Sequence, residues 1–136
     1  MTTEREPADV QVDLPPDLTA PGEARAAAKR ILPRWRLAPL LEPVLLVVSE
    51  LVGNAVRHGR PPVGLRLRKT DSGVRVDVHD ESPSTRPDAP GLVGADAESG
   101  RGLFLVDAVS AETGVENIAG DGKRVWAQVE PEPRDT

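Results

Sequence analysis

The sequence predicts an α/β fold of the α+β kind: a two-layer sandwich in which a mixed, mostly antiparallel sheet carries helices on one face. Two observations lead to this prediction. From about Leu41 to His58, apolar residues recur every three to four positions, as in an amphipathic helix. In residues 63–68 and 74–79, apolar and polar residues alternate, as in strands with one side on a core and the other in water. We expect the order strand, helix, helix, strand, strand, helix, strand, strand.

The first elements are a short strand and a modest helix. Apolar and polar residues alternate over residues 10–14, which is typical of an edge strand. The turn-rich segment PPDLTAPG follows. Apolar residues then recur at helical spacing from Glu23 to Leu32, and Pro33 is expected to stop this helix.

The second helix is the strongest periodic signal. Its apolar residues form one continuous stripe, which should face the sheet: Leu41, Val44, Leu45, Val48, Leu51, Val52 and Ala55. The two strands that follow are separated by Asp71-Ser72-Gly73, a typical turn sequence. They are therefore predicted to form an antiparallel hairpin.

The C-terminal third begins with a long segment, from Glu81 to Ser99, that is rich in Pro, Ser, Asp, Ala and Gly and has no sustained period. Such loops in compact domains are usually functional or disordered, and we interpret this one as a lid. Helical spacing resumes from Gly102 to Glu112. Strands are predicted near Val115 to Ile118 and from Lys123 to Glu130, with Asp121-Gly122 as the turn between them.

Length and composition predict one domain and exclude several classes of function. The 136 residues suit one domain, predicted over residues 10–130, with tails at 1–9 and 131–136. With 22 acidic and 17 basic residues, the net charge of -5 argues against direct nucleic-acid binding. No cysteine and only two histidines are present, so a metal must bind to oxygen ligands. No apolar run reaches about 18 residues, so we expect no membrane span and a cytoplasmic location.

The second helix carries the first candidate site, in the segment SELVGNAVRH. Glu50 and Asn54 are four residues apart and lie on one helical face, off the apolar stripe. A carboxylate beside an amide oxygen offers a general base next to a ligand for Mg²⁺, as phosphoryl transfer requires. The alternative is an ordinary exposed polar face. Gly53 beside Asn54 is explained either by a close approach to the backbone or by helix packing.

Two further groups lie near the ends of predicted elements. Asp80 continues the phase of the preceding strand and should point toward the helices, where it could accept a hydrogen bond from an adenine amino group; alternatively it caps a turn into Ser82. Gly100, Arg101 and Gly102 precede a helix, where backbone amides and a guanidinium suit phosphate. The same glycines also suit an ordinary joint between loop and helix.

Taken together and in this order, the three segments resemble the motifs of the GHKL (gyrase, histidine-kinase, MutL) ATPases, whose ATP-binding fold is also called the Bergerat fold. SELVGNAVRH is similar to the N box, DES to a reduced first glycine box and GRGLFLV to the second. The resemblance spans roughly residues 15–130 and is closest to the stand-alone anti-sigma-factor serine/threonine kinases.

This resemblance implies a role for each candidate residue. Glu50 would be the general base, Asn54 would hold Mg²⁺ against ATP, and Asp80 would bind adenine. The glycines Gly100 and Gly102 would close over the triphosphate, with Arg101 as a phosphate contact.

The implied partners are ATP, a small anti-anti-sigma (STAS-like) protein with a serine or threonine acceptor, and a sigma factor; a second copy of the chain is a further candidate. Two departures stand out: Ser82-Pro83 interrupts the first glycine box, and Arg124 lies about where many relatives carry a threonine that supports the adenine site. A regulatory adaptor that binds nucleotide without transferring phosphate, and a simple ATPase, are the alternatives.

Overall fold

The computed structural model describes residues 7–82, 104–118 and 122–131. The elements follow the predicted order. They are β1 (Asp9–Leu14), α1 (Ala20–Arg34), the short 3-10 helix η1 (Ala38–Leu40), α2 (Leu41–His58), β2 (Val63–Lys69), β3 (Val74–Asp80), β4 (Glu112–Ile118) and β5 (Gly122–Val129). Residues 104–109 form a further short stretch of helix before β4.

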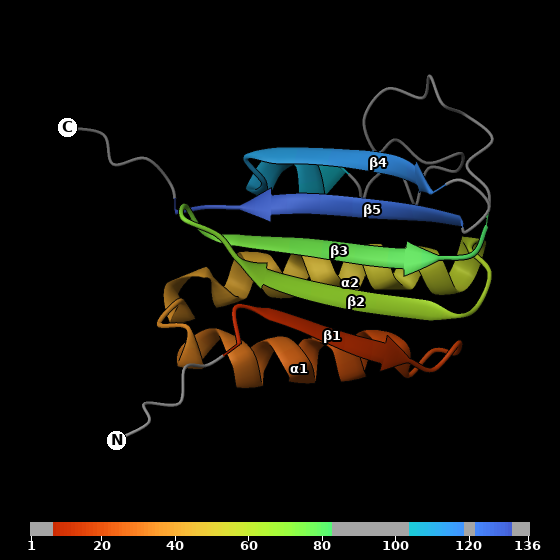
Figure 1. Cartoon of the computed structure of the whole chain (residues 1–136), viewed down its shortest axis with the longest axis horizontal. Helices are drawn as coiled ribbons and strands as arrows, with labels where there is room; N and C mark the ends of the chain where they lie inside the picture. The colour runs from red at the N-terminus through yellow and green to blue at the C-terminus, as the bar shows by residue number, and fades with distance from the viewer. Residues whose placement is uncertain (1–6, 83–103, 119–121, 132–136) are drawn as a thin grey trace.

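The five strands form one sheet in the order β1-β2-β3-β5-β4 (Figure 1). Every pair of neighbours is antiparallel, so the predicted mixed sheet is wrong in this detail for the described strands. The connection through α1 and α2 joins β1 and β2, which are neighbours and run in opposite directions. Strands β3 and β4 run in the same direction, but β5 lies between them and is antiparallel to both, so no parallel pair forms. The predicted hairpin of β2 and β3 is confirmed.

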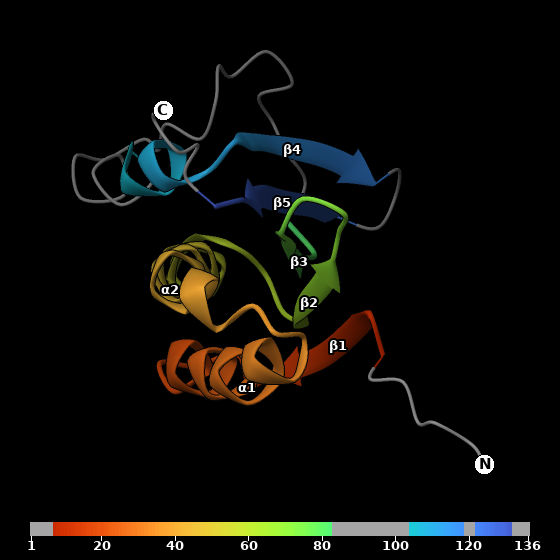
Figure 2. The same cartoon turned by 90° about the vertical axis from the view of Figure 1, so that its left-hand side faces the viewer.

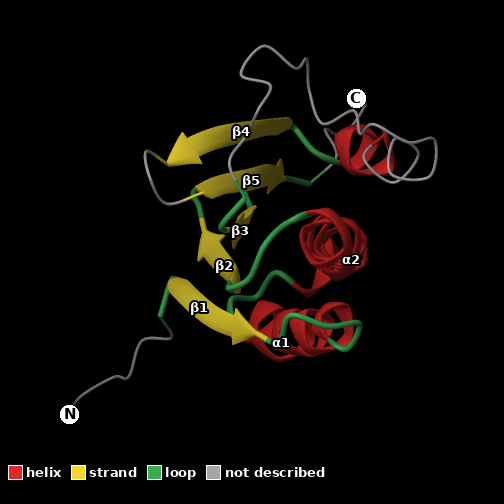
Figure 3. Cartoon of the chain, turned by 90° about the vertical axis from the view of Figure 1, so that its right-hand side faces the viewer, coloured by secondary structure: helices red, strands yellow, loops and turns green. Residues whose placement is uncertain are grey.

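Helices α1 and α2 and residues 104–109 lie on one side of the sheet, and the opposite side is left open by the described elements (Figures 2 and 3). The core fills the space between the two layers. It consists mainly of valine, leucine and alanine from α1, α2, β2 and β3. Burying this apolar surface is the main stabilising contribution to the fold. Residues Ala38–His58 are long and apolar enough to cross a membrane by length and composition alone, but α2 packs against both α1 and the sheet, as expected of a core helix.

Two predicted boundaries need correction. Pro33 lies inside α1, which continues to Arg34, because a proline so near the end removes only one backbone donor, and the N–H of Trp35 still bonds the carbonyl of Ile31. The third helix ends at Val109 rather than Glu112. Two residues later, the N–H of Ala111 donates to the carbonyl of Gln128 at 2.7 Å, which starts the pairing of the last two strands early.

The open face of the sheet carries a network of charged residues. Asp77 points to this side but is only 2 % exposed, since arginines of two strands cover it. Arg75 contacts its carboxylate at 3.1 Å and Arg68 at 3.4 Å. The guanidinium of Arg75 also lies 4.3 Å from the ring centre of Trp126, within the range of a cation–π contact. This face is therefore polar and internally paired.

Candidate active site

Asp80 is the last residue of β3, and its side chain belongs to the inner layer. Its register partner is Lys123 on β5, and it follows Val76 and Val78 on the buried face. It is only 1 % exposed. The prediction that the strand reaches Asp80 and points it toward the helices is thereby confirmed.

The turn that follows β3 fixes one oxygen of this carboxylate. Oδ1 of Asp80 accepts a hydrogen bond from the backbone N–H of Ser82 at 2.7 Å and another from the Ser82 hydroxyl. Asp80 therefore also caps the turn, so the two interpretations of this residue are compatible. The sequence motif shows Ser82 only as an interruption of a glycine box, whereas in the structure Ser82 orients the carboxylate.

Asp80 fits against two neighbouring segments because each has a glycine, without a side chain, at the point of contact. A Cβ atom on Gly59, which follows α2, would lie 2.5 Å from Cγ of Asp80 and 2.6 Å from the carbonyl oxygen of Ala55. A Cβ atom on Gly122 would lie 2.1 Å from the backbone oxygen of Asp80, and Gly122 has a φ of +94°, which favours glycine. The end of α2 and the start of β5 thus both approach this residue closely.

The second oxygen of Asp80 faces a lysine that the sequence does not single out. Nζ of Lys123 lies 3.9 Å from Oδ2 of Asp80. The lysine side chain is 25 % exposed, whereas that of Asp80 is 2 % exposed, so the ammonium is the outer member of the pair. A search for acidic and amide motifs misses Lys123, because its position opposite Asp80 depends on the register of β5.

Glu50 and Asn54 lie in α2, one turn apart, and both are partly buried. Glu50 makes no hydrogen bond or ion pair with another described residue. Oδ1 of Asn54 accepts a hydrogen bond from Nη2 of Arg57 at 2.9 Å. Nδ2 of the same amide is buried and has no hydrogen-bond partner in the described part of the chain. The amide is therefore only half satisfied.

The Arg57 guanidinium also lies near the glycine next to Asn54. A Cβ atom on Gly53 would lie 3.3 Å from Nη1 of Arg57, which is tighter than usual for such contacts. This guanidinium ends a long, exposed side chain and Gly53 is itself buried, so close approach and helix packing both stay explanations of this glycine. Oδ1 of Asn54, the one atom of this side chain that can bind a cation, is bonded to the Arg57 guanidinium in this structure. Gly100, Arg101 and Gly102 and most of the predicted lid lie outside the described residues.

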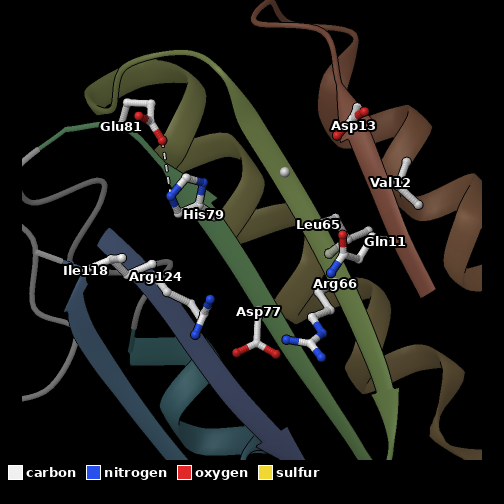
Figure 4. Close-up of a pocket in the computed structure, with 11 residues that line it drawn as sticks. Gln11, Val12, Asp13, Leu65, Arg66, Asp77, His79, Glu81, Ile118 and Arg124 are labelled. Atoms are coloured by element: carbon white, nitrogen blue, oxygen red, sulfur yellow. Dashed lines mark ion pairs between the residues drawn. The ribbon is translucent and has the colours of Figure 1, made fainter. Parts of the chain in front are cut away.

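A groove of about 430 Å³ lies on the open face of the sheet, away from these residues (Figure 4). Arg66, Asp77, His79 and Arg124 line it, and Nε2 of His79 lies 3.2 Å from Glu81. Arg124 pairs with His79 in the strand register and bonds to Glu116 at 3.4 Å. It therefore lies on the face of the sheet opposite Asp80, and the strand register pairs Lys123 rather than Arg124 with Asp80.

Comparison with known proteins agrees with this arrangement. Residues 14–129 match the family model of the histidine kinase-like ATPase domain. The chain belongs to this family. An uncharacterized protein of Streptomyces coelicolor is 42% identical to this ATPase domain over 73 residues, which are 53% of the chain and 69% of that protein.

Solved structures share the fold of this ATPase domain at low sequence identity. The RsbU and RsbW domains of a Mycobacterium tuberculosis protein match with a TM-score of 0.63 and 17% identity, over 94% of this chain and 34% of that one. A blue-light-activated histidine kinase from Erythrobacter litoralis matches with a TM-score of 0.56 and 21% identity, over 80% of this chain and 40% of that one. The chain thus spans well under half of these two proteins. The predicted fold of the GHKL ATPases is confirmed.

Proposed function

We propose that this ATPase domain is an ATP-dependent serine/threonine protein kinase of the cytoplasm, which phosphorylates a small anti-anti-sigma (STAS-like) partner and so controls a sigma factor. The observation that supports this most is Asp80. It is a buried carboxylate at the end of β3, held by Ser82 and packed against the C-terminal end of the helix that carries Glu50 and Asn54. The structural likeness to RsbU and RsbW domains favours this class of partner.

In this proposal, Asp80 selects the nucleotide. Its Oδ1 is occupied by Ser82, so Oδ2 is the oxygen that accepts a hydrogen bond from the adenine amino group. A buried carboxylate oxygen without a donor is costly, which makes the base a favourable partner. Arg101 and the backbone at Gly100 and Gly102 contact the phosphates, as the resemblance implies.

Glu50 acts on the protein substrate. The partner's hydroxyl oxygen attacks the γ-phosphorus, the bond from that phosphorus to the β–γ bridging oxygen breaks, and ADP leaves. The hydroxyl proton passes to the Glu50 carboxylate, which has no other described partner to compete for it. Asn54 would hold the metal through Oδ1, in place of the hydrogen bond that this oxygen now accepts from Arg57. Bound Mg²⁺ would neutralise the charge of the phosphates.

Two alternatives differ from a kinase in what happens to the γ-phosphate. Ser82-Pro83 in place of a complete glycine box favours an adaptor that binds nucleotide without turnover. A simple ATPase would use water in place of the partner hydroxyl. Both retain the contact between Asp80 and adenine.

The test is a phosphotransfer assay with Mg²⁺, γ-labelled ATP and candidate STAS-like proteins. We expect label on the partner with the wild-type protein and none with Glu50→Gln, which should still bind ATP. Glu42→Gln is a matched control, because Glu42 is an exposed carboxylate in the first turn of the same helix. Free phosphate alone would indicate an ATPase. Tight nucleotide binding without turnover would indicate the adaptor, and no ATP binding at all would refute the proposal.

A further inference from the structure

We infer that Lys123 is a second base-reading residue, which donates a hydrogen bond to adenine N1 beside Asp80 and sets the preference for adenine over guanine. This inference rests on the proposed function, because it takes Asp80 as the residue that accepts from the adenine amino group. Lys123 lies outside the motifs by which the family is recognised in this sequence.

The strand register places the two side chains next to each other. Asp80 and Lys123 are directly opposite in the antiparallel pair of β3 and β5, so both project from the same face. The neighbouring Arg124 projects from the other face, where it bonds Glu116. Lys123 is therefore the one cation from this end of β5 that reaches Asp80 among the described residues.

The distance between the two groups leaves both of them able to bind a ligand. Oδ2 of Asp80 and Nζ of Lys123 are 3.9 Å apart, whereas a charge-assisted hydrogen bond measures about 2.8 Å. The ammonium thus keeps its donors and Oδ2 keeps its lone pairs, because Ser82 bonds only to Oδ1. The pair presents an acceptor and a donor side by side.

Such a pair matches the Watson–Crick edge of adenine, which carries an amino donor next to the acceptor N1. With the amino group on Asp80, N1 faces the ammonium of Lys123. Guanine reverses both groups, since its O6 is an acceptor and its N1 carries a hydrogen. In the same position, guanine would set O6 against the carboxylate and N1–H against the ammonium. Both contacts would be repulsive, so Lys123 strengthens a discrimination that Asp80 begins.

The experiment replaces single atoms of the ligand. Calorimetry measures the binding of ATP, GTP and 1-deaza-ATP, in which a C–H group replaces N1, to four proteins: wild type, Lys123→Met, Lys123→Arg and Arg124→Met. Lys123→Met removes the donor and keeps the aliphatic stem, Lys123→Arg keeps a donor, and Arg124→Met is the matched control on the opposite face. Far-ultraviolet circular dichroism confirms that each variant is folded.

We expect the wild-type protein to bind 1-deaza-ATP roughly tenfold more weakly than ATP, as for the loss of one hydrogen bond to a charged donor. Lys123→Met should bind ATP roughly tenfold more weakly, treat the two adenine ligands alike and discriminate less against GTP. Lys123→Arg and Arg124→Met should keep the wild-type preference for ATP.

Two results would overturn the inference while leaving the proposed function intact. One is equal binding of ATP and 1-deaza-ATP by the wild-type protein, a comparison that needs no variant to fold. The other is an undiminished preference for ATP in Lys123→Met. Absence of ATP binding by the wild-type protein would overturn both the inference and the proposed function.

Discussion

Replacing Gly59 by alanine should displace Asp80 without adding or removing any charged group. The added Cβ would lie 2.5 Å from Cγ of Asp80, whereas ordinary van der Waals contact begins at 3.4 Å. The carboxylate or the end of α2 must therefore move by about 1 Å. Overpacking of this kind costs about 1–3 kcal/mol, against a gain of about 0.4–1 kcal/mol from restricting the unfolded chain. We expect a net loss of roughly 1–2 kcal/mol in the free energy of unfolding.

Urea denaturation measures this loss, and calorimetry with ATP measures the accompanying fall in affinity. Gly64→Ala is the matched control, since a Cβ on Gly64 would meet only the backbone oxygen of Val12, at 4.0 Å. Its stability should stay within about 0.5 kcal/mol of the wild type. If Gly59→Ala is as stable as the control and binds ATP equally well, the close packing of Gly59 on Asp80 is refuted.

Three further predictions concern charged groups. Arg57→Met frees Oδ1 of Asn54, so titration should show that nucleotide binding needs about two- to fivefold less Mg²⁺. Asp77→Asn breaks two ion pairs of a buried carboxylate and should lower the free energy of unfolding by about 1–3 kcal/mol in urea. The hydrogen bond from Arg66 lowers the pKa of Asp9. The pair therefore stabilises the fold at pH values above the unfolded pKa of Asp9, about 3.9, and this stabilisation is lost as the pH falls through the lower folded pKa.

The pair of Arg66 and Asp9 should add little to the free energy of unfolding, because the Asp9 side chain is exposed to water. Asp9→Asn should cost less than about 1 kcal/mol at neutral pH, and unfolding curves measured across acid pH should converge with those of the wild type. A constant difference at every pH would contradict the ion-pair interpretation. An unchanged magnesium requirement in Arg57→Met would contradict the prediction for Asn54. An unchanged unfolding midpoint in Asp77→Asn would contradict the prediction for the buried ion pairs.

The spacing of apolar residues predicted much of the fold, because residues that face the core must be apolar and so recur with the period of their helix or strand. The bounds of α2 and the hairpin of β2 and β3 follow from the spacing of valine and leucine, and the phase of β3 places Asp80 on the buried side. These features depend on neighbours in sequence, which a single chain records directly.

Features that depend on contacts between distant segments could not be predicted in this way. Polar alternation marks Asp77 as a residue of the open face, but its burial depends on arginines of β2 and β3 that fold over it. Lys123 reaches Asp80 only because β5 pairs with β3 in one register. The contact of Arg57 with Asn54 depends on the rotamer of a long side chain. The roles of Glu50 and Asn54 stay predictions.

The close approach of Gly122 to the backbone of Asp80 bears on how homologues should be judged. A homologue could keep every acid, amide and lysine of this site and still carry a bulkier residue at this position. Its β5 would then be pushed away from the end of β3, and the chemically intact groups would be out of reach of one another. Surveys that infer activity from reactive groups alone would count such a protein as active, so they should also require the glycine.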